Sequence, residues 1–162
     1  MHAWHMEPYP CGDRRLPHHI FPPKMLTPDQ LHALTGVVYY KVDIDDTNAL
    51  KKRLSKVKAD RNVVCSDMFT INSSLSDLDM KLEELYEPVT RDEDSVYLVI
   101  EGSAYYDVEK EEDEWIRMNV EKGDLIVIPK GLSQRFTVTP KNYVLVQRFF
   151  QSDRSKPQSA QG

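Results

Sequence analysis

Alternation of apolar and polar positions dominates the second half of the chain. Six short runs, rich in β-branched and aromatic residues, are separated by turn-forming residues. This pattern predicts six strands, at residues 95–101, 104–109, 114–120, 124–128, 134–138 and 143–150. Gly102-Ser103 and Lys122-Gly123 are typical of hairpin turns between such strands. Many short strands at this spacing favour a sandwich or barrel, in which few strand edges stay open.

Helical periodicity is confined to the first half of the chain. Residues 27–30 form a capping sequence of Thr, Pro, Asp and Gln, and Gly36 is placed to end the helix that follows. A second helix is predicted to begin after Thr47 or Asn48 and to end near residues 60–62, because its apolar residues recur at helical spacing.

A third helix is predicted between Ser76, as its N-cap, and Pro88, which stops it. Residues 37–42 are β-branched and aromatic and predict a strand. Trp4 and Met6 favour a short strand added to a sheet edge. The pattern as a whole predicts a mainly β fold, with two or three short helices in the N-terminal half.

The length of 162 residues suits a single domain with a real core. Apolar residues make up 40% of the chain and charged residues 29%, as in soluble globular proteins. We expect residues 1–150 to form this domain. Residues 151–162 are mainly Ser, Gln, Lys and Pro, and we expect a disordered C-terminal tail there.

Charge and cysteine content narrow the partners and the compartment. The net charge of −5 argues against a nucleic-acid surface, which needs clustered Lys and Arg. Two cysteines are too few for a disulfide framework. Residues 1–10 have neither the basic nor the apolar region of a signal peptide, and no apolar run is long enough to insert into a membrane. These features favour the cytoplasm, and a chain this small also suits the nucleus.

Glycine and proline positions in the second half follow the spacing of the two cupin motifs. These motifs read H-x-H-x(3)-E-x(6)-G and G-x(5)-P-x-G-x(2)-H. Here Gly102 closes the first motif, and Gly123, Pro129 and Gly131 occupy the scaffold positions of the second. The histidine and glutamate positions, however, have all changed. All five histidines of the chain precede residue 33.

Several longer stretches make the resemblance more specific: the chain resembles the acireductone dioxygenases, in their eukaryotic form. The similarity covers nearly the whole of residues 1–150. Its landmarks are residues 3–6, 12–13, 37–43, 86–87, 101–108, 121–124, 129–131, 135–138 and 141–143.

This resemblance implies a cupin-type double-stranded β-helix, that is, a jelly-roll barrel. The family binds Fe(II) or Ni(II) through three histidines and one glutamate, and oxidises the acireductone intermediate of methionine salvage, the metal deciding the products. The resemblance to its eukaryotic members also implies a location in the cytoplasm and nucleus. These members are linked to binding the cytoplasmic tail of a membrane metalloprotease. The resemblance also implies a monomer.

Carried over residue by residue, the family pattern loses every metal ligand. The histidine positions hold Val89, Arg91 and Gln134, and the glutamate position holds Ser95. Valine has no donor atom, arginine is a permanent cation, and the serine and glutamine oxygens are weak ligands. The position two residues after the glutamate, usually an arginine that holds the anionic substrate, is Tyr97. The family's C-terminal segment after the last strand is also missing or replaced.

A metal site could also be built from other donors in the chain. Oxygens of Asp92, Glu93 and Asp94 would suit Mg²⁺ or Ca²⁺ better than the dioxygenase metals, and a solvated acidic turn is the simpler interpretation. Cys65 is a typical inert core residue. Nothing in the spacing brings a histidine from the N-terminal arm to the barrel. We therefore expect no metal cofactor.

Three hypotheses follow. The favoured one is a catalytically inactive acireductone dioxygenase homologue with a binding or regulatory role toward a protein partner, for example an active paralogue. The alternative is an active metal-dependent dioxygenase of methionine salvage with an unorthodox site. The third is a metal-free ligand pocket, for which the candidate residues are Arg91, Tyr97 and Phe136, although Phe136 also suits a core position.

Overall fold

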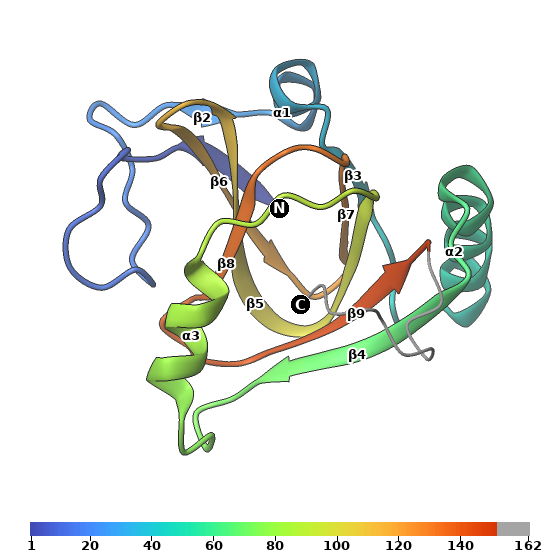
Figure 1. Cartoon of the computed structure of the whole chain (residues 1–162). Helices are drawn as coiled ribbons and strands as arrows, with labels where there is room; N and C mark the ends of the chain where they lie inside the picture. The colour runs from blue at the N-terminus through green and yellow to red at the C-terminus, as the bar shows by residue number, and fades with distance from the viewer. Residues whose placement is uncertain (152–162) are drawn as a thin grey trace.

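The computed structural model describes residues 1–151, which form nine strands and three helices (Figure 1). The strands are β1 (His2–His5), β2 (Met25–Leu26), β3 (Val38–Lys41), β4 (Cys65–Ile71), β5 (Ser95–Glu111), β6 (Glu114–Glu121), β7 (Asp124–Ile128), β8 (Gln134–Val138) and β9 (Val144–Phe150). The helices are α1 (Pro28–Thr35), α2 (Thr47–Arg61) and α3 (Leu78–Tyr86). The predicted mainly β fold with a few helices in the first half is confirmed. The predicted tail lies, apart from Gln151, outside the described residues.

Strand β5 is the spine of a curled antiparallel sheet. Its first part, residues 95–102, pairs with β7 and β9, and its second part, residues 103–111, pairs with β6 and β8. Strands β1 and β2 extend the sheet beyond β6, β3 extends it beyond β7, and β4 pairs with β9. The short strand expected around Trp4 is β1, on the edge of β6. Figure 1 shows the sheet curling around an interior with the helices outside it.

The hairpin predicted at Gly102-Ser103 is wrong, because β5 runs straight through these residues. Gly102 has a φ of +79°, and a Cβ atom there would collide with the carbonyl oxygen of Tyr143. The Ser103 N–H donates to the same carbonyl at 3.1 Å. The glycine therefore lets β9 approach while the strand bends from one side of the sheet to the other, a use of glycine that sequence does not distinguish from a turn.

The helix ends follow local rules in two cases and depart from them in a third. The Gln30 N–H donates to Thr27 Oγ1 at 3.1 Å and the Thr27 N–H to Gln30 Oε1 at 2.9 Å, which completes the predicted capping box of α1. Asp46 caps α2 by accepting from two amides. The predicted Ser76 cap of α3 is wrong: the N-cap is Asp77, whose carbonyl accepts from the Lys81 N–H at 2.9 Å.

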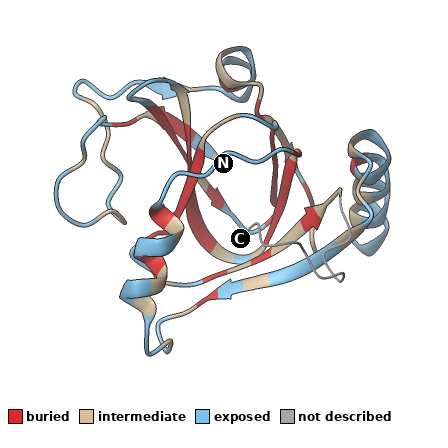
Figure 2. Cartoon of the chain, in the orientation of Figure 1, coloured by how far each residue is buried: buried red, intermediate tan, exposed pale blue. Residues whose placement is uncertain are grey.

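The interior of the curled sheet is apolar. Buried residues there come from several strands, among them Ile126 and Met118, and from α1, which contributes Leu31. A second cluster lies between α2 and the outer face of the sheet, where Val57 packs with the strand residues of that face. Figure 2 shows the buried positions concentrated on the strands, whereas most of α2 is exposed. Within residues 1–151, no helix is both long and apolar enough to cross a membrane.

One buried ionic cluster ties the N-terminal arm to the sheet. Arg117 donates through Nε and Nη2 to the two carboxylate oxygens of Asp107, at 2.8 and 2.9 Å. Arg135 Nε donates to the same carboxylate at 3.0 Å. Nη1 of Arg117 donates to the carbonyls of Arg14 and Leu16, at 2.8 and 2.6 Å. One carboxylate therefore serves two buried cations.

Candidate functional site

The four positions that would carry the metal ligands converge at one end of the curled sheet. Val89 and Gln134 form an antiparallel bridge, with amide-to-carbonyl distances of 2.8 and 2.9 Å. Ser95 is the first residue of β5 and Gln134 the first of β8. The Arg91 carbonyl accepts from the Gly131 N–H at 2.9 Å, which fastens the segment before β5 to the turn before β8.

At this end of the sheet the polar side chains bond to one another. The Tyr97 hydroxyl donates to Gln134 Oε1 at 2.9 Å, and Gln134 Nε2 donates to Ser95 Oγ at 3.1 Å. All three residues are buried. The amide of Gln134 is thus satisfied at both ends, which is what a polar group removed from water requires.

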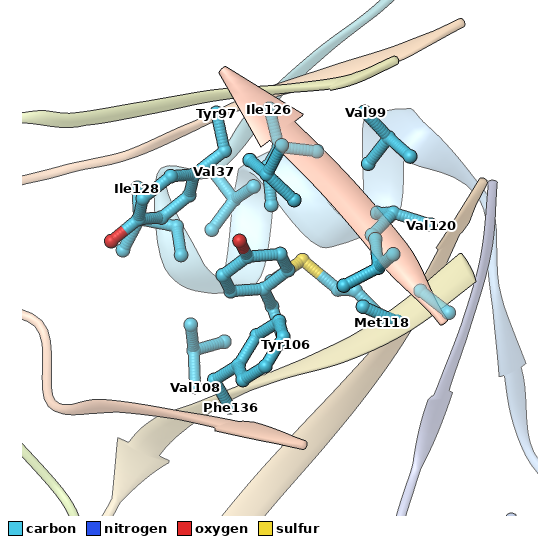
Figure 3. Packing of buried hydrophobic residues seen from close by; sticks show 14 of the residues in the cluster. Val37, Tyr97, Val99, Tyr106, Val108, Met118, Val120, Ile126, Ile128 and Phe136 are labelled. Carbon is cyan, nitrogen blue, oxygen red and sulfur yellow. The ribbon is translucent and has the colours of Figure 1, made fainter. Parts of the chain in front are cut away.

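Aromatic rings fill the space beside this chain of hydrogen bonds. The rings of Tyr97 and Tyr106 are stacked with centroids 4.6 Å apart, and Phe136 meets Tyr106 edge-on at 5.0 Å. Figure 3 shows these three side chains together with the aliphatic core. Burial raises the pKa of Tyr106 well above its ordinary value, and the neighbouring Tyr97 raises it further. Tyr106 therefore stays protonated across the physiological range.

Two adjoining cavities open at this end. One, of about 170 Å³, is lined by all three candidate pocket residues, Arg91, Tyr97 and Phe136. The other, of about 180 Å³, is more polar and contains Ser95. Arg91, Tyr97 and Arg148 line both cavities, so the two arginines stand where the cavities meet. The structure thus brings the three sequence-predicted pocket residues together.

Arg148 is the site residue that sequence reasoning missed. Its guanidinium donates to both carboxylate oxygens of Asp67, at 2.8 and 2.6 Å, and lies 4.8 Å from the ring centroid of Phe69. The hydrogen bonding of the Arg148 guanidinium to the Asp67 carboxylate is the main reason that the pKa of Arg148 is raised. The only signal in the sequence is a charged residue inside the otherwise mostly apolar strand β9, and that pattern equally suits an outward-facing position.

Arg91 differs from Arg148 in its charge environment. Its side chain is exposed at the rim of the cavities. In the part of the chain that the structure describes, no carboxylate lies within ion-pair distance of it. An exposed cation keeps its hydration, so Arg91 needs no partner to be stable in this position.

Comparison with known proteins identifies the family. A family model described as the ARD/ARD' family matches residues 2–158. The chain belongs to this family. It is 63% identical over 150 residues to the Caenorhabditis elegans protein named "Probable inactive acireductone dioxygenase 1", covering 93% of this chain and 94% of that one. It is 38% identical over 149 residues to the human protein named "Acireductone dioxygenase", covering 91% of this chain and 82% of the human protein.

A solved structure from the same family confirms the fold. The acireductone dioxygenase of Bacillus anthracis, solved with a cadmium ion in its active centre, superposes with a TM-score of 0.72 at 19% identity. The superposition covers 83% of this chain and 91% of that protein. The cupin-type fold that the family resemblance implies is therefore confirmed.

The residues of this chain do not fit the Fe(II) or Ni(II) ion that the family resemblance implies. Val89 offers no donor atom, and Arg91 carries a positive charge that repels a cation. The two remaining positions, Ser95 and Gln134, are neutral, and their polar atoms are engaged with each other. Such ions are held by imidazole, carboxylate or thiolate, none of which occupies a ligand position here.

The other donors weighed from the sequence do not assemble into a replacement site. Asp94 accepts from Arg61 at 3.2 Å and from the Lys130 amide at 3.0 Å, as expected for a turn-stabilising carboxylate. Cys65 begins β4, opposite Phe150. Among residues 1–151, no three His, Cys, Asp or Glu side chains gather closely enough to hold a metal ion.

Proposed function

We propose that this chain is a catalytically inactive member of the acireductone dioxygenase family that has a binding or regulatory role. The observation that carries the proposal is the Tyr97–Gln134–Ser95 chain of hydrogen bonds at the family's ligand positions. A dioxygenase needs a metal with open coordination positions, and this arrangement supplies buried neutral groups that satisfy one another instead.

The names of the relatives support this proposal, since they differ with sequence identity. The Caenorhabditis elegans protein at 63% identity has "Probable inactive" in its name, whereas the human protein at 38% identity is named as the enzyme. Inactivity in this chain is consistent with the more similar relative.

A metal-retention experiment tests the proposal. The purified protein is incubated anaerobically with Fe(II) or Ni(II), dialysed, and analysed for bound metal. An active family member serves as the positive control. The variant Val89→His/Arg91→His/Ser95→Glu/Gln134→His serves as the reconstructed site. We expect the native chain to lose its metal on dialysis and the reconstructed variant to retain more. Stoichiometric metal in the dialysed native chain would overturn the proposal.

Oxygen uptake separates this proposal from the alternative of an active enzyme with an unorthodox site. The native chain is mixed with acireductone in the presence of Fe(II) or Ni(II), and the rate is compared with that of the metal alone. We expect the two rates to be equal, because no imidazole or carboxylate is available at the ligand positions. A rate above the metal-only control would favour the active-enzyme alternative.

The proposed role is exerted on a protein partner in the cytoplasm or nucleus, an active enzyme of methionine salvage being the first partner to test. The net charge of −5 supports a protein rather than a nucleic acid. We further propose that the chain itself is a monomer. Light scattering after size exclusion, with and without an active family member, measures both properties, and a partner would show as a heavier co-eluting species.

A second candidate function is a metal-free pocket for a small organic anion. The observation that favours it is the placing of Arg91 and Arg148 between the two cavities, with aromatic walls on one side. A thermal-shift screen of carboxylates and phosphates on the native chain and on Arg91→Gln tests it. Stabilisation that is lost in the variant supports this function, and no stabilisation by any anion removes it.

A further inference from the structure

A basic groove lies between α2 and the end of β3, and its lining shares no residue with the two cavities of the candidate site. It has a volume of about 350 Å³ and is lined by Lys41, Val42, Asp43, Ala49, Lys52, Arg53 and Lys56. Four of these seven residues are cations and one is an anion. Lys41 pairs with the buried Asp124 at 3.6 Å, so the local excess of positive charge comes from the three cations of α2.

Helix α2 presents two separate stripes. Leu50, Leu54 and Val57 face the sheet and pack into the second apolar cluster. Ala49, Lys52, Arg53 and Lys56 recur at i, i+3, i+4 and i+7, so they share one face and form a wall of the groove. Figure 1 shows α2 standing at the edge of the sheet, and Figure 2 shows its outer surface exposed. The basic stripe is therefore accessible and held in place by the apolar one.

The positive charge of this stripe is weakly neutralised. Lys56 pairs with Asp60 at 3.4 Å, but both side chains are mainly exposed, and such a pair contributes little. Within residues 1–151, no carboxylate lies within ion-pair distance of Lys52 or Arg53. The guanidinium of Arg53 lies 4.3 Å from the ring centroid of Tyr40, which fixes its plane beside the groove.

We propose that this groove binds an extended acidic peptide segment of a partner protein, with two carboxylates separated by one residue. Lys52 and Lys56 are one helical turn apart, or about 6 Å along the helix axis. Side chains on one face of an extended chain repeat every two residues, at about 6.6–6.8 Å. Alternate acidic residues therefore match the two lysines, and the guanidinium of Arg53, on the same wall of the groove, can donate two hydrogen bonds to one of these carboxylates.

Charge and shape favour a peptide over a nucleic acid or a membrane. Asp43 lines one end of the groove, and Asp45 and Asp46 follow it along the chain, so only the stretch that faces α2 attracts an anion. Two carboxylates fit within this stretch, whereas a continuous phosphate backbone would run on into the acidic end and meet repulsion there. The basic residues wall a concave groove, whereas a membrane surface is flat. This inference does not rest on the proposed loss of metal binding, because the groove and the ligand positions share no residue.

Fluorescence anisotropy of the full chain tests the proposal. The probe is a short labelled peptide, acetylated and amidated, with glutamate at alternate positions, and the same peptide with glutamine is the negative probe. We expect saturable binding of the glutamate peptide alone. Lys52→Gln/Lys56→Gln should weaken binding about tenfold, the size of losing two exposed ion pairs. Gln keeps the helix propensity of Lys, and circular dichroism verifies folding.

The matched control is Lys51→Gln/Lys58→Gln. It removes the same charge from the same helix at positions that do not line the groove. We expect less than about a twofold loss. Equal losses in the two variants would overturn the proposal, because net charge alone would then explain binding. Absence of saturable binding would also overturn it, as would tighter groove-dependent binding of oligothymidylate or of phosphatidylserine vesicles.

Discussion

Asp107→Asn is the substitution that most directly probes how the buried charges are held. The side chains of Asp107 and Arg117 are 1% and 0% exposed, and that of Arg135 is 8% exposed. Removing one partner of a buried ionic group costs about 3–5 kcal/mol, because the remaining charges stay buried without compensation. Here two arginines lose their shared carboxylate, which favours the upper part of that range. In a domain of this size the loss corresponds to a fall in Tm of roughly 10 °C.

Asp67→Asn is the matched control, because it removes the carboxylate of an exposed pair instead of a buried one. Asp67 also accepts two hydrogen bonds from one arginine, Arg148, but these two side chains are 44% and 32% exposed. An exposed pair of this kind contributes about 0.2–1 kcal/mol. Urea unfolding followed by tryptophan fluorescence measures both variants, because Trp4 and Trp115 are buried in the folded chain and become exposed on unfolding. Equal losses in the two variants, or a loss below about 1 kcal/mol for Asp107→Asn, would refute the burial argument.

Three further predictions concern the site, the bend and the arm. Gln134→Ala should lower the unfolding free energy by about 2–3 kcal/mol in the same urea assay, because the buried hydroxyls of Tyr97 and Ser95 lose their amide partner. A loss under about 0.5 kcal/mol would contradict this. Gly102→Ala should lower the unfolding free energy by about 2–4 kcal/mol, because the new Cβ would collide with the Tyr143 carbonyl. Gly131 also has a positive φ but open space around it, so Gly131→Ala should lower the unfolding free energy by only about 1–2 kcal/mol. The reverse order of urea midpoints would count against the close approach of β9. Burial lowers the pKa values of His5 and His19 below the ordinary 6.5, so the unfolded chain takes up protons first and stability should fall as the pH drops through 6.5. Replacing both by Gln should flatten this pH dependence of the urea midpoint, and an unchanged slope would exclude these histidines as its source.

The strands and helices were largely predictable because their signals are local. The alternation of Val96, Leu98 and Ile100 with their neighbours predicts a strand, and four consecutive residues predict the cap of α1. The replaced ligand positions were also readable, since motif spacing is a property of the chain itself. Gly102 is a position where the local sequence does not decide the structure. A glycine with positive φ serves a hairpin or a close approach equally well, and only the position of Tyr143 distinguishes the two.

The chemistry between distant residues belongs to the tertiary structure. Sequence alone determined that imidazole and carboxylate are absent at the ligand positions, because the residue type at each position is known without the structure. That Gln134 satisfies Tyr97 and Ser95, some 37 and 39 residues away along the chain, was decided by the folding of β5 against β8. The pairing of Arg148 with Asp67 depended in the same way on β4 lying beside β9. A side chain's residue type says which bonds it can form, and only the packing of strands brings the partner within reach.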